Sequence, residues 1–281
     1  MSFYRFFQKE EDGVWHPIQD SADVVEAAKR EGAKKLTILA VNKPLGAEDA
    51  KRGNSYKGPL YFDIDSSEGL KHSIESARLL VNKLLETYET PRQALSIYLS
   101  GKKGFHVIVD QRAFMQRRVA VKDLPLIYKL MATELFVSGL DLSPYAVGRN
   151  NTFRIANLKR YDGNYRVPCT VEELSEMTPE RYVELVAAPR AHLVFADYDG
   201  DCSVKLQLLY ASASEKLARM DKELTSRTRD LAQGELAKIA DHAPPCIDEL
   251  CSGKGHRQGA SFNDIALNVA LWASRAQVPE M

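Results

Sequence analysis

The sequence predicts an α+β protein in which a mixed body of strands and helices is followed by a small, all-helical C-terminal domain. Up to Pro189, short apolar runs typical of strands alternate with amphipathic helical stretches. Beyond it, residues 203–240 form a long charged stretch with no proline and one glycine, which is typical of helix. We therefore divide the chain into residues 1–200 and residues 201–281.

The pattern of residues justifies each early element in turn. Residues 21–33 have helical periodicity, and the serine that starts them is a typical N-cap. Residues 35–41 form an apolar run, and residues 60–65 are rich in β-branched and aromatic side chains, so both are expected to be strands. Residues 67–88 carry apolar side chains at helical spacing, and Pro91 follows them.

The later elements follow from the same signals. A Thr-x-x-Glu capping box, Thr170 with Glu173, begins a short helix. The other expected elements are strands 94–99 and 105–109, helix 124–137, a strand pair 153–156 with 165–168, helices 170–177 and 179–186, strand 192–196, and helices 247–251 and 262–274.

Composition excludes several classes of protein. The chain has 281 residues, and 44% of them are hydrophobic, as in soluble globular proteins. No apolar run approaches the roughly 20 residues that cross a bilayer, so we expect no membrane partner. Four scattered cysteines are too few for a disulfide framework, and the first residues lack the apolar core of a secretory signal. We expect a cytoplasmic protein. The 38 basic residues balance the 38 acidic ones, which by itself argues against a nucleic-acid partner.

Two carboxylates flank Ile64 near the end of a predicted strand. Side chains two residues apart point to the same face of a strand, so Asp63 and Asp65 are expected to lie a few ångströms apart. Like charges this close are costly unless a cation lies between them. Oxygen ligands of this kind favour Mg²⁺ or Mn²⁺. An ordinary strand end with exposed acids would have the same pattern.

The segment from Ser100 to His106 reads Ser-Gly-Lys-Lys-Gly-Phe-His and joins two predicted strands. Its glycines permit a positive φ and a close approach of backbone to a ligand. The N–H groups of the turn and Lys103 would bind an anion, with His106 contacting phosphate oxygens from the next strand. A basic surface turn remains the alternative.

A third acid and a basic segment follow a predicted helix. Asp141 is the acid we favour, and Asp110 and Asp123 are its rivals. Arginine is suited to bidentate phosphate contact, although charge runs are often simply solvated. The basic residues of this segment are Arg149, Arg154, Lys159 and Arg160.

Together these three pieces resemble the archaeo-eukaryotic primase superfamily, the primase-polymerases. Its pattern is an acidic pair at a strand end, a Ser-Gly-x-Lys-Gly-x-His hairpin and a third acid, which here are Asp63-Ile-Asp65, Ser100–His106 and Asp141. Many members then have a Tyr, an Arg-Asn pair and a Phe-Arg followed by a Lys. Tyr145, Arg149-Asn150, Phe153-Arg154 and Lys159 stand in those places, whereas Ala156 stands where a proline is frequent.

The resemblance implies an RNA-recognition-like antiparallel sheet with an N-terminal α/β unit. It implies that Asp63, Asp65 and Asp141 bind two divalent metals, Mg²⁺ or Mn²⁺. Its nucleotide-binding residues would be Ser100, Lys103, Gly104, His106 and Arg154, and its nucleic-acid contacts Arg149, Lys159 and Arg160. The implied partners are a single-stranded DNA template, ribo- or deoxynucleoside triphosphates and a replicative helicase. The chemistry is attack of a 3′-hydroxyl on an α-phosphate with release of pyrophosphate, which makes and extends primers for a phage, plasmid or other mobile element.

The helical tail resembles small domains appended to mobile-element primases, which help hold the template or the initiating nucleotide. Lys254, His256 and Arg257 are its candidate contacts. Two histidines and two cysteines lie nearby, but their spacing is not that of a standard zinc finger, so we expect neither zinc nor an iron–sulfur cluster.

Three other functions fit parts of the same pattern. One is a gap-filling polymerase of this superfamily that extends primers without initiating them. Another is a non-catalytic replication-initiation protein that binds nucleic acid, and a third is a metal-dependent hydrolase of nucleotides. The intact set of three acids argues against the non-catalytic alternative.

Overall fold

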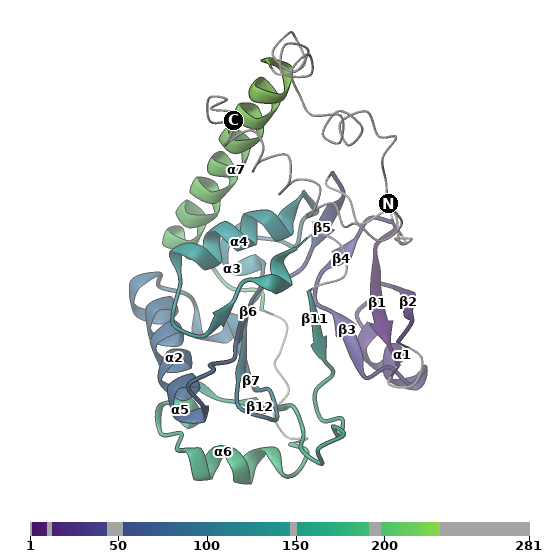
Figure 1. Cartoon of the computed structure of the whole chain (residues 1–281), viewed down its shortest axis with the longest axis vertical. Coiled ribbons are helices and arrows are strands. Elements are labelled where there is room, and N and C mark those ends of the chain that lie inside the picture. The colour runs from purple at the N-terminus through teal and green to yellow at the C-terminus, as the bar shows by residue number, and fades with distance from the viewer. Residues whose placement is uncertain (1, 10–12, 44–52, 147–150, 191–197, 231–281) are drawn as a thin grey trace, which may run out of the picture. The chain divides into compact units, whose positions relative to one another are not determined.

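The computed structural model describes residues 2–9, 13–43, 53–146, 151–190 and 198–230. The chain divides into two compact units, Met1–Leu217 and Ala218–Met281. The first unit contains two antiparallel sheets and the helices packed on them (Figure 1), so the predicted α+β class is confirmed there.

The second sheet along the chain carries the motifs of interest. Its five strands run in the order β10-β6-β8-β7-β12, and every neighbouring pair is antiparallel. The strands are β6 (Leu60–Ile64), β7 (Leu95–Leu99), β8 (Phe105–Val109), β10 (Leu140–Asp141) and β12 (Val167–Cys169).

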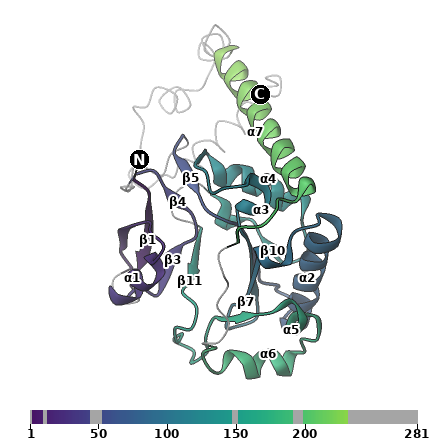
Figure 2. The same cartoon turned by 180° about the vertical axis from the view of Figure 1, so that it is seen from behind.

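Two helices complete the pattern of this sheet. The order in the chain is strand β6, helix α2 (Leu70–Asn82), strands β7 and β8, helix α4 (Leu124–Glu134) and strand β10, with only short elements between them. This is a ferredoxin-like order of strands and helices. Helix α2 packs on β6 and β8, and α4 packs on β6. Both helices are labelled in Figure 2. Alternation along β6 buries Phe62 and Ile64 in the main core and leaves Asp63 on the opposite face.

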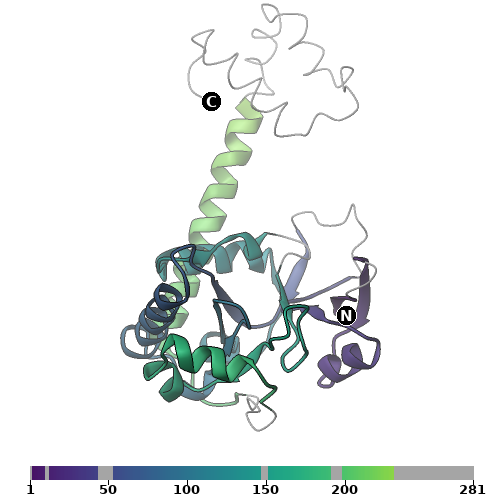
Figure 3. The same ribbon diagram turned by 60° about the horizontal axis from the view of Figure 1, so that its bottom comes forward.

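The other sheet is built mainly from the N-terminal residues. Its order is β11-β3-β1-β4-β5-β9, with β2 paired to β1 at the side. In Figure 3 this sheet and α1 lie across the central strands from α2. Its strands are β1 (Tyr4–Gln8), β2 (Trp15–Gln19), β3 (Lys35–Thr37), β4 (Ala40–Val41), β5 (Ser55–Lys57), β9 (Val121–Lys122) and β11 (Thr152–Arg154), and its helix is α1 (Val24–Arg30).

The remaining elements are short, apart from the last helix. The capping box of α5 is confirmed, since Thr170 and Glu173 each accept a hydrogen bond from the other's backbone N–H. Helix α7 begins in the main core, where Leu206 and Leu209 are buried. These elements are α3 (Arg112–Met115), α5 (Val171–Ser175), α6 (Pro179–Val186), α7 (Val204–Asp230), a π-helical turn at Lys83–Thr87, and 3-10 turns at Arg92–Ala94 and Ser143–Tyr145.

Several expected elements need correction. The predicted strand pair of residues 153–156 with 165–168 is wrong, because β11 pairs with β3 and β12 pairs with β7, each in a different sheet. The run 35–41 is divided into β3 and β4. Helix α1 starts at Val24 behind Asp23, and the Ser21 hydroxyl donates to the Asp23 carboxylate rather than capping the helix. The elements expected at 192–196, 247–251 and 262–274 lie outside the described residues. In the described part of the chain, no helix has the length and apolar character required to cross a membrane.

Candidate functional site

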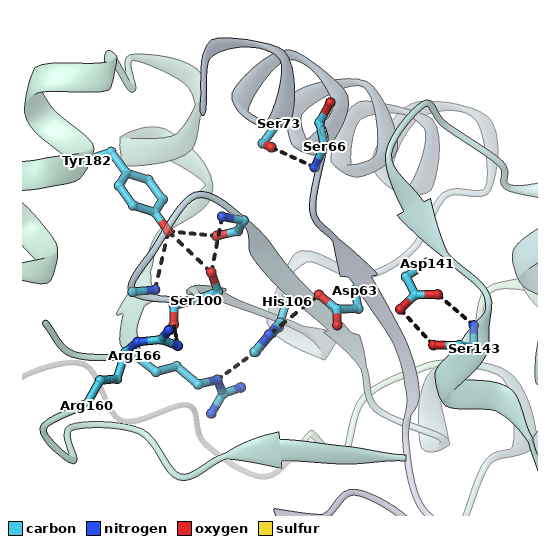
Figure 4. A network of polar contacts seen from close by, with 12 residues as sticks. Asp63, Ser66, Ser73, Ser100, His106, Asp141, Ser143, Arg160, Arg166 and Tyr182 are labelled. Carbon is cyan, nitrogen blue, oxygen red and sulfur yellow. Dashed lines mark hydrogen bonds and ion pairs between the residues drawn. The ribbon is translucent and has the colours of Figure 1, made fainter. Parts of the chain in front are cut away.

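Polar side chains from three adjacent strands meet in one row across the second sheet. Asp141 of β10 is the register partner of Asp63 in β6, and Asp63 is the partner of His106 in β8. His106 is in turn the partner of Tyr98 in β7. Side chains of directly opposed residues lie on the same face of a sheet, about 5 Å apart at Cβ. The sheet therefore gathers two acids and a histidine that are up to 78 residues apart (Figure 4).

Asp63 is the acid whose ionisation is most perturbed. Its side chain is 27% exposed. Burial raises its pKa from 3.8 to about 7, and the charges of Asp141 and Asp65 contribute to the rise. The carboxylate is therefore short of positive charge.

Asp65 lies just beyond the end of β6, where its N–H donates to the carbonyl of Gly139. Its carboxylate is 53% exposed, and its Oδ1 atom lies 3.3 Å from the ammonium of Lys103. That ammonium also donates to the carbonyl of Ser66 at 3.0 Å. Lys103 thus ties the β7–β8 turn to the end of β6.

Asp141 is held beside Asp63 by a short turn. Its two carboxylate oxygens accept hydrogen bonds from the N–H and the hydroxyl of Ser143, both at 2.8 Å. The same turn is anchored to β6, because the Tyr61 hydroxyl donates to the carbonyl of Pro144 and the Tyr61 and Tyr145 rings stack at 4.8 Å.

The two rival acids have other partners. Asp110 accepts from Arg112 at 3.0 Å and from Arg118 at 2.6 Å. Hydrogen bonds from these arginines hold its pKa below the usual value despite the opposing effect of burial. Asp123 is buried and accepts from the N–H of Gly53. Of the three acids, Asp141 is the one in register with Asp63.

His106 is enclosed by aromatic and basic side chains. Its ring stacks on Phe153 with a centroid distance of 3.9 Å and an interplanar angle of 9°. Its Nε2 atom lies 3.6 Å from Oδ1 of Asp63, and its Nδ1 atom accepts from Nε of Arg166 at 2.8 Å. Burial lowers the pKa of His106 well below 6.5, and the positive charges of Arg166 and Arg160 lower it further.

The turn between β7 and β8 is closed by its own hydrogen bonds. The Ser100 hydroxyl accepts from the N–H of Gly104 at 3.1 Å, and the Gly101 N–H donates to the hydroxyl of Tyr182. The Tyr182 hydroxyl donates to the Gly104 carbonyl at 2.9 Å. Two N–H groups of the expected anion nest and the Ser100 hydroxyl therefore already have partners within the protein.

Glycine is required at position 104 because two chain segments approach closely there. A Cβ atom added to Gly104 would lie 2.3 Å from the carbonyl oxygen of Ile64, far inside contact distance. Gly101 has φ +92°, the left-handed region that favours glycine. The positive φ of Gly101 agrees with the sequence prediction for this turn, whereas the close approach at Gly104 is to the backbone of Ile64 rather than to a ligand.

A cleft of about 450 Å³ lies over the row of polar residues. Of the residues predicted from the sequence, Asp63, Ser100, His106, Arg154 and Arg160 line it. Asp65, Lys103 and Asp141 do not, and Lys159 is exposed outside it. Arg149, Lys254, His256 and Arg257 lie outside the described residues.

The cleft also contains residues that the sequence did not indicate. Gln8, Trp15 and Lys35 line it from the N-terminal sheet, and no motif singles them out. Arg166, which contacts His106 but does not line the cleft, was missed as well. The one signal for it in the sequence is an arginine directly before the predominantly apolar run Val167–Cys169.

A second cavity of about 580 Å³ is open between the two sheets. Arg154 and Phe153 line both this cavity and the cleft, so the two adjoin. Among the described residues that line it, the charged ones are Arg5, Lys57, Arg118, Arg154, Arg166 and a single acid, Asp20. A basic region thus lies next to the acidic centre.

The carboxylates are not gathered into a complete metal site. Among the described residues, no group of three or more histidine, cysteine, aspartate or glutamate side chains is close enough to hold an ion. The donor types still fit a divalent cation that prefers oxygen, because Asp63 and Asp141 are neighbours and Asp63 is short of positive charge.

Comparisons with known proteins give a distant structural likeness. No family model matches the sequence, and no curated protein matches it either. Among solved structures the chain is similar to primase RepB′, at 14% identity and a TM-score of 0.40, over 98% of this chain and 76% of that one. It is also similar to the polymerase domain of Mycobacterium tuberculosis ligase D in complex with DNA, at 16% identity and a TM-score of 0.38, over 66% of this chain and 70% of that one.

Proposed function

We propose that the protein is a template-directed primase-polymerase, which makes and extends primers on single-stranded DNA by metal-dependent nucleotidyl transfer. We place this activity in the replication of a phage, plasmid or other mobile element. The observation that carries the proposal is the cross-strand row Asp141–Asp63–His106 beside a cleft lined by Arg154 and Arg160. Acids and phosphate-binding cations side by side are what phosphoryl transfer requires.

Asp63, Asp65 and Asp141 would hold the divalent metals. A bound Mg²⁺ or Mn²⁺ would polarise the α-phosphate and promote ionisation of the attacking 3′-hydroxyl. To bind a metal, Asp65 would give up its ion pair with Lys103. The freed ammonium of Lys103 is then available to the phosphates of the incoming nucleotide, as the family resemblance implies.

The basic side chains of the cleft bind and orient the nucleotide. His106 donates to a phosphate oxygen, and Arg154 stabilises the charge of the departing pyrophosphate. Ser100 and Gly104 act indirectly, because their mutual hydrogen bonds fix the turn that places His106 on β8. Holding the phosphate chain in line with the 3′-hydroxyl supplies the positional part of the rate enhancement.

The nucleic acid is bound beside the nucleotide. Arg149, Lys159 and Arg160 are the proposed contacts in the catalytic body, and Lys254, His256 and Arg257 those in the C-terminal domain. The basic cavity that adjoins the cleft supports this placement, because its lining is rich in arginine although the whole chain is neutral.

Synthesis of labelled primers on single-stranded DNA tests the proposal. The wild-type protein, given Mg²⁺ or Mn²⁺ and all ribo- and deoxynucleotides, is expected to make oligonucleotides complementary to the template. Asp63→Asn should abolish the products, whereas Asp199→Asn, a change at an exposed acid that lines neither cavity, should not. Free nucleoside mono- or diphosphates as the only products would show a hydrolase instead and overturn the proposal.

A further inference from the structure

Arg166 makes an unusual contact for a buried arginine. The residue is 6% exposed, and its Nε–H donates to Nδ1 of His106 at 2.8 Å (Figure 4). Its guanidinium carbon lies 3.7 Å from the centre of the Tyr98 ring and 5.6 Å from that of Phe153. Stacking between these rings fixes the plane of the guanidinium group and leaves Nε directed at the histidine.

This contact determines which nitrogen of His106 carries the proton. A guanidinium group donates hydrogen bonds and cannot accept them, so Nδ1 must present its lone pair. The proton of the neutral ring is then on Nε2. That atom points toward Asp63, from which it is 3.6 Å away, and His106 lines the cleft.

The ring has little freedom to change this arrangement. It is stacked on Phe153 at 3.9 Å, and its β8 backbone is paired on both sides, to β6 and to β7. Turning the ring over would bring the Cδ2–H edge, which cannot accept a hydrogen bond, against the guanidinium group and lose the 2.8 Å hydrogen bond.

We propose that Arg166 is a positioning residue for the reaction: it holds His106 as a fixed Nε2–H donor aimed at the phosphates of the nucleotide. The proposal rests on the proposed function only for the identity of the acceptor, the nucleotide phosphates. The tautomer of His106 does not depend on that function. Arg166 itself acts through His106. The alternative is that Arg166 only stabilises the edge of the sheet near β12.

The tautomer can be measured without any activity. In the full-length protein labelled with ¹⁵N-histidine, long-range ¹H–¹⁵N spectra distinguish a protonated ring nitrogen from an unprotonated one, and His106→Gln identifies the His106 signals. We expect an unprotonated Nδ1 and a protonated Nε2 in the metal-free wild type at neutral pH. A proton on Nδ1 would overturn the proposal, whether or not the protein polymerises nucleotides.

A double-mutant cycle separates positioning from general stabilisation. Arg166→Met removes the donor and keeps an apolar stem, and we expect it to lower kcat/KM for the nucleotide about tenfold, mainly through KM. In a His106→Ala background the same change should alter kcat/KM less than twofold, because the group on which Arg166 acts is gone. Equal losses in both backgrounds would overturn the proposal.

Two further variants keep the result interpretable. Arg166→Lys retains a cation and a donor, so it should fold if Arg166→Met does not and should recover part of the lost nucleotide affinity. Arg78→Met removes an arginine that donates to the carbonyls of Leu174 and Met177, outside the cleft. Any effect of Arg78→Met on kcat/KM should be the same in the wild-type and His106→Ala backgrounds. If Arg166→Lys also had the same effect in both backgrounds, that result would contradict the positioning role.

Discussion

Asp63 is a carboxyl group whose surroundings favour the protonated form. Burial and the two neighbouring acids raise its pKa to about 7 in the folded protein, from 3.8. Between these two values the folded state holds the proton and the unfolded state has lost it, so the free energy of unfolding falls as the pH rises. Above about pH 7 the destabilisation is complete. A variant without a carboxylate at position 63 does not lose this part of the free energy of unfolding.

Asp63→Asn is therefore expected to stabilise the metal-free protein, and increasingly so from pH 5 to pH 8. Thermal unfolding in the presence of a chelator measures the difference in Tm, which should be small at pH 5 and largest at pH 8. Asp199→Asn serves as the control and should have no such trend. A variant no more stable than the wild type at pH 8 would contradict the perturbed ionisation of Asp63.

Addition of a metal ion tests whether Asp63 is a ligand. At pH 8, Mn²⁺ should raise the Tm of the wild type and should raise that of Asp63→Asn much less, because binding to the folded state alone is stabilising. Equal stabilisation of the two proteins by Mn²⁺ would mean that Asp63 is not a ligand.

At this scale the sequence predicted the residues of the motifs but not their partners. The spacing of Asp63 and Asp65 and the glycine-rich turn before His106 were recognisable in the chain. The hydrogen bond from Arg166 to His106 was not recognisable. It depends on β12 pairing with β7, which lies next to β8, the strand of His106. The lining residues Gln8 and Trp15 come from a hairpin that carries no functional motif.

Among the elements, the β7–β8 turn is the one on which the position of His106 depends most. Gly104 lies against the backbone of Ile64, and a Cβ there would be 2.3 Å from a carbonyl oxygen. Backbone atoms on both sides cannot yield as a flexible side chain would. Separation of the turn from β6 is the way to relieve the overlap.

Gly104→Ala should accordingly destabilise the protein by about 3 kcal/mol, the upper end of the cost of overpacking. Gly163→Ala is the matched comparison, because its φ of +90° is strained for alanine but nothing lies within 4 Å of the added Cβ. We expect it to cost only about 1 kcal/mol. Urea unfolding of both variants checks the order, and a smaller loss at Gly104 than at Gly163 would contradict the close approach.

Pairing between elements was the part of the fold that the sequence predicted least well. Residues 153–156 and 165–168 look like a hairpin because two apolar runs flank a turn, yet their strands join opposite sheets. The strand pattern indicates which face is buried but not which strand lies alongside. The first hairpin was not predicted, and one of its strands contains Pro17, a residue type that is unfavourable within a sheet. β2 tolerates it because β2 pairs only with β1 and lies at an edge.

For the whole molecule, the neutral net charge hides a separation of charge. The chain has 38 basic and 38 acidic residues, but the described lining of the larger cavity has five basic side chains and one acid. A net charge of zero therefore does not exclude nucleic acid as a partner. It does predict that binding depends on a few local phosphate contacts.

Binding of single-stranded DNA should consequently be modest in affinity and weaken with salt, with a slope set by the number of phosphate contacts. Fluorescence anisotropy of a labelled oligonucleotide, measured from low to physiological salt, gives the slope of log affinity against log salt concentration. Arg160→Gln should reduce the slope by about one, as expected for the loss of one phosphate contact. An affinity that does not depend on salt would exclude the proposed mode of binding, and Arg181→Gln on the exposed side of α6 is the control.

We propose that Asp63 and its register partner Asp141 form the reaction centre. Addition of a single nucleotide to an annealed primer, in Mg²⁺ or Mn²⁺, tests it most directly when Asp63→Asn, Asp141→Asn and Asp110→Asn are compared with the wild type. We predict that the first two lose at least about a hundredfold in rate. Asp110→Asn should stay within a few-fold of the wild type, because Asp110 is paired with Arg112 and Arg118. An active Asp141→Asn together with an inactive Asp110→Asn would contradict the account.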